Sequence, residues 1–176
     1  IIPEGKDVLE NVEVIGGKLV AQYLHDATTQ LKVFNLDGKF LGDVELPGLG
    51  VVSSISGKPD HPEAFFSFTS FIRPSSIYKL NMETLETELY REPDLDFDSD
   101  AFETYQVWYE NPVDQTRIPM FITHRKGLEL NGERPTLLYG YGGFNISVKP
   151  GFSVTRAVLL ENDGVYAVAN IRGGGE

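Results

Sequence analysis

Two glycine-rich segments carry the residues of this chain whose types and spacing suit chemistry. Residues 137–145 read Leu-Leu-Tyr-Gly-Tyr-Gly-Gly-Phe-Asn, and residues 168–176 read Val-Ala-Asn-Ile-Arg-Gly-Gly-Gly-Glu. Each is a short apolar run that ends in glycines, which is typical of a buried parallel strand leading into a ligand-facing loop. A helical pattern separates them. We therefore expect one β-α-β unit with both loops at the carboxyl ends of its strands, where open α/β sheets bind ligands.

No serine of the chain has the setting of a hydrolase nucleophile. A nucleophile elbow needs a serine between two closely spaced glycines on a strand-to-helix turn. Residues 151–155 (Gly-Phe-Ser-Val-Thr) lack the second glycine, and residues 48–56 have no such spacing. The three histidines, His25, His61 and His124, lie in polar strand ends or turns, and we expect each to be exposed. The chain alone is therefore expected to be catalytically inert.

Composition narrows the classes of partner and cofactor. A net charge of −11 over 176 residues argues against a nucleic-acid partner, which would select a basic face. The absence of cysteine excludes a disulfide framework, a thiolate zinc site and a cysteine nucleophile. We expect no cofactor, no metal and no membrane partner, and a cytoplasmic location. The chain begins Ile-Ile-Pro without an initiator Met, so a missing signal peptide says little about a longer product.

The first ninety residues are strand-like throughout and contain an internal repeat. The predicted strands cover residues 9–15, 18–25, 30–35, 40–46, 51–56, 63–72, 76–81 and 84–90. A shift of 44 positions lays residues 20–24 over residues 64–68, and the Asp37-Gly38 turn over Asn81-Met82. Four short strands per unit at a period in the forties indicate propeller blades. An eight-stranded sandwich is the alternative on pattern alone.

An acidic run with a proline, residues 92–100, marks the domain boundary. Its alternating aspartates invite comparison with a calcium loop. That template fails, because Ser99 occupies the position of the required glycine and Tyr105 that of the closing glutamate. We expect a solvated crossing between domains.

An α/β pattern follows this boundary. Residues 102–110 and 118–124 alternate like antiparallel strands, whereas residues 136–139 and 165–171 are continuous apolar strands. Residues 153–161 have helical spacing, with Ser153 as the expected N-cap and Gly164 as the expected left-handed residue after the helix. This order predicts the opening of an α/β-hydrolase sheet.

Residues 139–145 and 170–176, together with their spacing, resemble the prolyl oligopeptidase family of serine peptidases, in its prolyl endopeptidase branch. The resemblance implies that residues 1–95 form the last two blades of a seven-bladed β-propeller. Residues 96–176 would begin the α/β-hydrolase domain, with the catalytic triad outside this chain. It also implies hydrolysis on the carboxyl side of proline. The expected partners are short proline-containing peptides and the remaining part of the same enzyme.

The same resemblance assigns roles within the first glycine-rich segment. Tyr141 is the family's oxyanion-hole tyrosine, and a phenol suits that role because it stays protonated at neutral pH. Phe144 belongs to the proline pocket, where an aromatic face can stack on the ring. Gly142 and Gly143, with Gly140, are expected to allow positive φ and close substrate approach. The structural alternatives are a tyrosine that braces the loop and a phenylalanine in the core beneath it.

Further features leave alternatives open. We expect Arg172 to be a buried structural partner of a carboxylate, and the Asn145-Ile146-Ser147 glycosylation pattern to be accidental. A non-catalytic propeller that mediates interactions, or a peptide-cyclising relative, would share all the residues of both glycine-rich segments. A serine flanked by glycines after residue 176, followed by Asp and His, would identify the enzyme.

Overall fold

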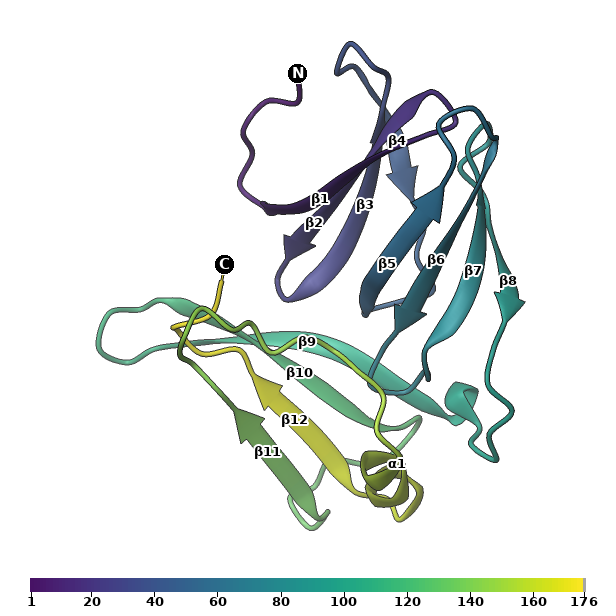
Figure 1. Cartoon of the computed structure of the whole chain (residues 1–176). Coiled ribbons are helices and arrows are strands. Elements are labelled where there is room, and N and C mark those ends of the chain that lie inside the picture. The colour runs from purple at the N-terminus through teal and green to yellow at the C-terminus, as the bar shows by residue number, and fades with distance from the viewer. Residues whose placement is uncertain (176) are drawn as a thin grey trace.

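The computed structural model describes residues 1–175, so Glu176 at the end of the second glycine-rich segment lies outside the described residues. Within them the strands form three four-stranded sheets, ordered β1-β2-β3-β4, β5-β6-β7-β8 and β11-β12-β10-β9 (Figure 1). The strands of the first two sheets are β1 (Val8–Ile15), β2 (Lys18–His25), β3 (Thr28–Phe34), β4 (Phe40–Val44), β5 (Val51–Gly57), β6 (Glu63–Thr69), β7 (Ser76–Asn81) and β8 (Thr87–Arg91). The third sheet contains β9 (Phe102–Glu110), β10 (Arg117–Arg125), β11 (Thr136–Gly140) and β12 (Val165–Ala169).

The first two sheets are antiparallel meanders of consecutive strands that pack face to face. Alternation drives this packing, because β6 buries Ala64, Phe66 and Phe68 and turns the residues between them outward. The shared core also contains Val33 of β3 and Leu80 of β7. Residues 1–90 contain no helix, as expected for two blade-like units.

The predicted repeat is confirmed in its strand order, but its turns align differently. After the third strand of each sheet an asparagine side chain closes the turn. Asn35 Oδ1 accepts from the N–H groups of Asp37 and Lys39, and Asn81 Oδ1 accepts from those of Glu83 and Thr84. Asn81 therefore corresponds to Asn35 and not to Asp37. The longer β6–β7 hairpin of the second sheet shifts the register between the repeats.

That hairpin also ends β6 at Thr69, earlier than the predicted end at residue 72. Residues 70–75 form a turn in which the Ser70 N–H donates to the Arg73 carbonyl oxygen at 3.0 Å. The Arg73 N–H donates to Ser70 Oγ at 3.0 Å. The turn carries Phe71 away from the second sheet. Smaller differences from prediction lie at the ends of β3, β4, β8 and β12.

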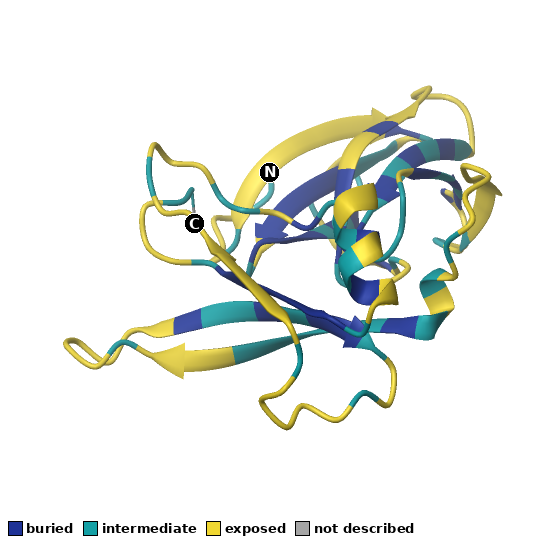
Figure 2. Ribbon diagram, turned by 90° about the horizontal axis from the view of Figure 1, so that it is seen from below, coloured by how far each residue is buried: buried dark blue, intermediate teal, exposed yellow. Residues whose placement is uncertain are grey.

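The third sheet is mixed and has a helix against it. β11 and β12 are parallel, whereas β10 pairs antiparallel with both β12 and β9. The helix α1 (Val154–Glu161) connects the parallel pair and buries Ala157 and Leu160. β12 is buried along its whole length, while β1 and β11, at sheet edges, are exposed along nearly all of theirs (Figure 2).

The predicted helix boundaries are close, but the capping chemistry differs. Ser153 has extended N-cap geometry and makes no capping hydrogen bond, because its hydroxyl pairs with Thr155 Oγ1 at 2.8 Å. The left-handed residue after the helix is Asp163, with φ 56°, and not Gly164. Gly164 is required for space, since a Cβ there would lie 2.4 Å from Leu159 Cδ1. Its N–H donates to the Leu159 carbonyl oxygen at 2.9 Å, which completes a Schellman motif.

A second hydrophobic core joins the third sheet to the first two. Phe71, 3% exposed, packs edge-to-face on Phe121 of β10 and Tyr166 of β12, with ring centroids 5.3 and 5.4 Å apart. The Arg156 guanidinium of α1 lies 5.0 Å from the centre of the Tyr166 ring. Ala27, at the tip of the β2–β3 hairpin, is fully buried in the same cluster. The β2–β3 and β6–β7 hairpin tips therefore dock on the third sheet.

His124 corrects another expectation. His25 and His61 are exposed as predicted, but His124 is 4% exposed. It lies on β10, an inner strand of the third sheet. Its Nδ1 pairs with the Arg125 carbonyl oxygen at 2.8 Å, and its Nε2 pairs with the Tyr105 hydroxyl at 3.3 Å. These contacts give it a structural role.

The segment between the second and third sheets contains a short 3₁₀ turn, η1 (Ser99–Ala101), capped by the Asp98 side chain.

Among residues 1–175, no group of three or more His, Asp or Glu side chains is arranged to hold a metal ion. In the same residues, no helix is long and apolar enough to cross a membrane.

Candidate substrate-binding loops

The parallel pair of strands brings the two glycine-rich segments to one edge of the third sheet. Gly140, the last residue of β11, pairs in register with Ala169, the last residue of β12. The first loop (residues 141–153) and the second loop (residues 170–175) therefore start side by side. The predicted β-α-β unit, with both loops at the carboxyl ends of its strands, is confirmed.

The two loops meet backbone to backbone, and this contact explains their glycines. A Cβ at Gly142 would lie 2.0 Å from the Arg172 carbonyl oxygen, and one at Gly173 would lie 2.7 Å from the Gly142 carbonyl carbon. The Asn145 N–H donates to the Gly173 carbonyl oxygen at 3.0 Å. No side chain fits between these backbones. The glycines thus serve loop packing.

The expectation of positive φ at Gly140, Gly142 and Gly143 is wrong. Left-handed backbone occurs instead at Gly173, with φ 100°, and at two residues that are not glycine, Phe144 (φ 54°) and Asn145 (φ 60°). The reason is that the chain turns back toward the second loop one step later than the sequence indicates. The Ile146 N–H closes this turn on the Gly143 carbonyl oxygen at 3.1 Å.

Phe144 has two unusual properties. Its side chain is 91% exposed, so the alternative of a core phenylalanine beneath the loop is wrong. A bulky residue in left-handed conformation is also strained. A bare aromatic ring held at a conformational cost is more typical of a binding residue than of a packing residue.

Tyr141 leaves a hydrogen-bond donor free at the same place. The Tyr141 side chain is 37% exposed and lies close to Gly143. A Cβ built on Gly143 would be 3.7 Å from the Tyr141 hydroxyl oxygen. Among the described residues the hydroxyl has no hydrogen-bond partner. Its ring thus contacts the loop, while its donor remains available.

A cleft of about 230 Å³ runs along the two loops. Tyr141 and Arg172 line it from the loops, and Pro119 lines it from β10. Asp26, on the β2–β3 hairpin of the first sheet, borders the same cleft. Sequence reasoning missed Asp26, because no local pattern shows which hairpin tip approaches a loop far along the chain.

Arg172 differs from its expected role in one respect. It does form an ion pair with a carboxylate, that of Asp114 in the β9–β10 turn. However, the arginine side chain is 60% exposed and not buried. A hydrogen bond from the Thr116 N–H and the Arg172 guanidinium hold the pKa of Asp114 below its ordinary value of 3.8. The pair joins the second loop to the β9–β10 turn.

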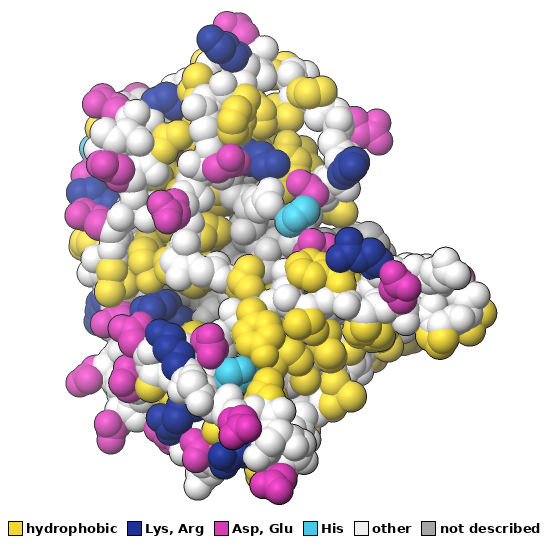
Figure 3. Space-filling model, turned by 180° about the vertical axis from the view of Figure 1, so that it is seen from behind, with side chains coloured by type: hydrophobic (Ala, Val, Ile, Leu, Met, Phe, Trp, Pro, Cys, Tyr) yellow, Lys and Arg dark blue, Asp and Glu magenta, His cyan; other side chains and the backbone are white. Residues whose placement is uncertain are grey.

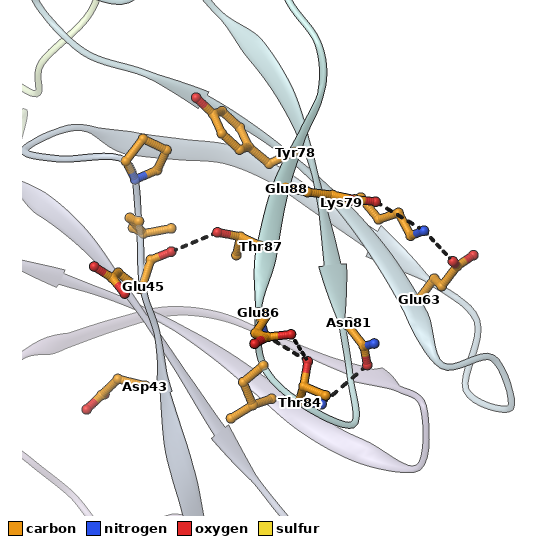
Figure 4. A pocket seen from close by; sticks show the side chains of 13 residues that line it. Asp43, Glu45, Glu63, Tyr78, Lys79, Asn81, Thr84, Glu86, Thr87 and Glu88 are labelled. Atoms are coloured by element: carbon orange, nitrogen blue, oxygen red, sulfur yellow. Dashed lines mark hydrogen bonds and ion pairs between the residues drawn. The ribbon is translucent and has the colours of Figure 1, made fainter.

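A larger groove lies elsewhere, between β4 and the β7–β8 hairpin (Figure 4). Its volume is about 940 Å³, and carboxylates dominate its lining. Lys79 Nζ bridges Glu63 and Glu88 at 2.7 and 3.2 Å. The hydrogen bond between Lys79 and Glu63 lowers the pKa of Glu63 and raises that of Lys79. The groove lacks both glycine-rich loops and contains none of the candidate site residues.

Comparison with known proteins decides the family. The family model described as the prolyl oligopeptidase N-terminal β-propeller domain matches residues 1–93. The chain belongs to the prolyl oligopeptidase family. Its first two antiparallel sheets are therefore propeller structure, and the sandwich alternative is excluded.

Similarity to prolyl oligopeptidase relatives extends beyond the propeller match. The prolyl endopeptidase of Elizabethkingia meningoseptica is 43% identical over 176 residues, covering 100% of this chain and 25% of the relative. That of Dictyostelium discoideum is 39% identical, covering 100% and 24%. The structure of prolyl oligopeptidase B from Galerina marginata superposes with a TM-score of 0.87 at 31% identity, covering 99% and 26%. The chain thus spans about a quarter of the length of the relatives it matches.

Proposed function

We propose that this chain is part of a serine endopeptidase that hydrolyses short peptides on the carboxyl side of proline. In this proposal, residues 1–95 are the last two blades of a seven-bladed propeller. Residues 96–176 begin the α/β-hydrolase domain. Two observations support the division: the family model stops at residue 93, and a mixed sheet with a β-α-β unit replaces the antiparallel meanders after it.

The uncovered face of the third sheet supports the same proposal. Hydrophobic side chains gather over this sheet (Figure 3), and Met120, Ile122 and Leu138 line an apolar groove there. Leu138 is 64% exposed although it lies in a strand of continuous apolar residues. A sheet of an α/β domain is normally covered on both faces. Such a face fits a sheet that belongs to a larger domain.

Within this enzyme Tyr141 donates a hydrogen bond to the oxyanion of the acyl-transfer transition state. An oxyanion donor must be protonated, fixed in place and free of other partners. The unpaired hydroxyl of Tyr141, with its ring against Gly143, meets these requirements. The nucleophile, its base and the orienting carboxylate lie outside this chain, so Tyr141 contributes electrostatic stabilisation only.

Phe144 forms part of the pocket for the proline on the acyl side of the cleaved bond. Its exposed ring offers an apolar face on which a proline ring can stack. Gly142 and Gly143 lie between Tyr141 and Phe144 in the chain. Gly142 makes room for the second loop, and Gly143, where a Cβ would meet only the Tyr141 ring, leaves space for the substrate backbone to approach. The single observation that carries the proposal is this pairing of a free phenol and a bare, strained aromatic ring on one loop.

Cyclisation of peptides is the second candidate activity. A relative from Amanita bisporigera, named a dual function macrocyclase-peptidase, is 34% identical over 99% of this chain. An acyl-enzyme can transfer its acyl group to water or to an amine with the same oxyanion donor and the same proline pocket. The residues of the two loops serve both outcomes. A non-catalytic propeller protein is the third candidate.

The test uses the full-length protein and two matched peptide amides, one with an internal proline and one with alanine in its place. We expect cleavage after proline only, and stoichiometric labelling by a phosphonate that reacts with serine nucleophiles. The product mass separates hydrolysis from cyclisation, because a cyclic product lacks the added water. Absence of both turnover and labelling would contradict the peptidase proposal and favour a binding protein.

A further inference from the structure

Two polar contacts join the first loop to the propeller. Lys149 of the loop forms an ion pair with Glu10 of β1. Further along, the Phe152 N–H donates to Thr69 Oγ1, at the end of β6, at 3.3 Å. One contact goes to each blade. The loop that carries Tyr141 is therefore held from the propeller as well as by the second loop.

The position of Glu10 on β1 is specific. Glu10 is the extra residue of a β-bulge, because the pairing of β1 with β2 skips it. A bulge redirects a side chain out of the regular alternation. The Gln22 side chain donates to Glu10 Oε2 at 3.3 Å and orients the carboxylate. The corresponding bulge in β5 contains Ser53, so the repeat carries a carboxylate only in the blade that faces Lys149.

The ion pair between Lys149 and Glu10 is partly buried. The side chains of Lys149 and Glu10 are 35% and 23% exposed. Salt screens such a pair only in part, and an oriented carboxylate favours one position of its partner. In contrast, the tip of the loop leaves the Phe144 ring exposed, and its backbone is bonded to the second loop through the Asn145 N–H. The contacts with the propeller therefore hold the part of the first loop that the second loop does not hold.

We propose that Lys149 is a positioning residue: its ion pair with Glu10 transmits the docking of the propeller to the first loop and sets the geometry of Tyr141 and Phe144. When the propeller moves away, the pair breaks and the loop loses one of its two polar contacts with the blades. This inference rests on the proposed function, and it adds to that function one residue that holds the first loop in place.

The test compares Lys149→Gln with wild type in the full-length protein. We expect kcat for a proline-containing amide to fall about 5-fold, the scale of a partly shielded ion pair, with a smaller change in KM. Amide hydrogen exchange in residues 141–153 should become faster. Lys79→Gln is the matched control, since it also breaks ion pairs of one lysine but lies in the acidic groove of Figure 4. It should change neither kcat nor exchange in the loop.

Charge reversal separates positioning from a general loss of stability. The double variant Glu10→Lys/Lys149→Glu restores an ion pair and should recover most of the lost turnover and loop protection. A double variant as slow as its single variants, or unchanged exchange in Lys149→Gln, would overturn the inference. The exchange measurement needs no activity. If wild type cleaves no proline substrate, the proposed function fails while the exchange result still decides the role of Lys149.

Discussion

Gly142 and Arg172 are in contact through their backbones, with room for no atom between the Gly142 Cα and the Arg172 carbonyl oxygen. A Cβ built on Gly142 would come within 2.0 Å of that oxygen. This contact locks the loop that carries Tyr141 to the loop that follows β12. The site is therefore one unit made from two loops.

Gly142→Ala should separate the two loops. We expect a loss of about 1–3 kcal/mol in the free energy of unfolding, typical of overpacking, and a fall in kcat because Tyr141 moves with the loop. Gly151→Ala is the matched control, because a Cβ there meets nothing within 4 Å. Urea unfolding and steady-state kinetics of the full-length protein measure both effects. Equal stability of the two variants would contradict the loop contact.

Phe144→Gly should weaken the binding of proline substrates without lowering the free energy of unfolding. Glycine relieves the left-handed strain at φ 54°, so the free energy of unfolding should stay within about 1 kcal/mol of wild type or rise. Loss of the ring should raise KM for proline substrates about 10-fold, the scale of one aromatic stacking contact. Asn145→Gly relieves similar strain but keeps the ring, and its KM should not change. An unchanged KM in Phe144→Gly would remove Phe144 from the proline pocket.

The Asp114–Arg172 pair should make stability depend on acid pH. The folded-state pKa of Asp114 is lowered by the Thr116 N–H and by Arg172, so its contribution to stability is present above the ordinary, unfolded pKa of 3.8. It is lost as pH falls through the folded pKa. Asp114→Asn should therefore lower stability at pH 7 and converge with wild type in acid. A constant difference from pH 7 down to below the folded pKa would show that the carboxylate charge is not responsible.

Phe71→Ala should weaken the docking of the propeller on the third sheet. Removal of a buried phenylalanine costs about 3–5 kcal/mol, and Phe71 is 3% exposed against Phe121 and Tyr166. Phe40→Ala, at a position that is 49% exposed, should cost far less. The measurement is the urea midpoint of both variants. Similar midpoints would show that the interface contributes little to stability.

The sequence predicts the strands and the β-α-β unit well, because alternation and continuous apolar runs are local signals. Prediction from the sequence fails where a residue far along the chain determines the local structure. The run 63–72 reads as one strand, yet Ser70 closes a turn and Phe71 packs on Phe121. The glycines of the first loop read as conformational, yet Gly142 is required by a carbonyl from a segment thirty residues later.

In the candidate site, too, some features follow from the local sequence and others depend on distant contacts. Tyr141 and Phe144 follow from a specific string of residues, and the structure places both side chains at the cleft edge or in solvent. His124 is buried and Arg172 is exposed because of how distant segments of the chain pack around them. The residues next to them in the sequence do not indicate this packing. The Lys149–Glu10 pair joins positions far apart in the chain and has no local signal at all.

The most direct test of the central claim is the kcat of Tyr141→Phe in the full-length protein. Steady-state hydrolysis of a peptide amide with an internal proline avoids the masking that activated esters can cause when another step limits the rate. Loss of one oxyanion donor should lower kcat about 10²–10³-fold, or about 2.7–4 kcal/mol, with a smaller effect on KM. A variant with wild-type kcat would show that Tyr141 only braces the loop and would contradict its role in catalysis.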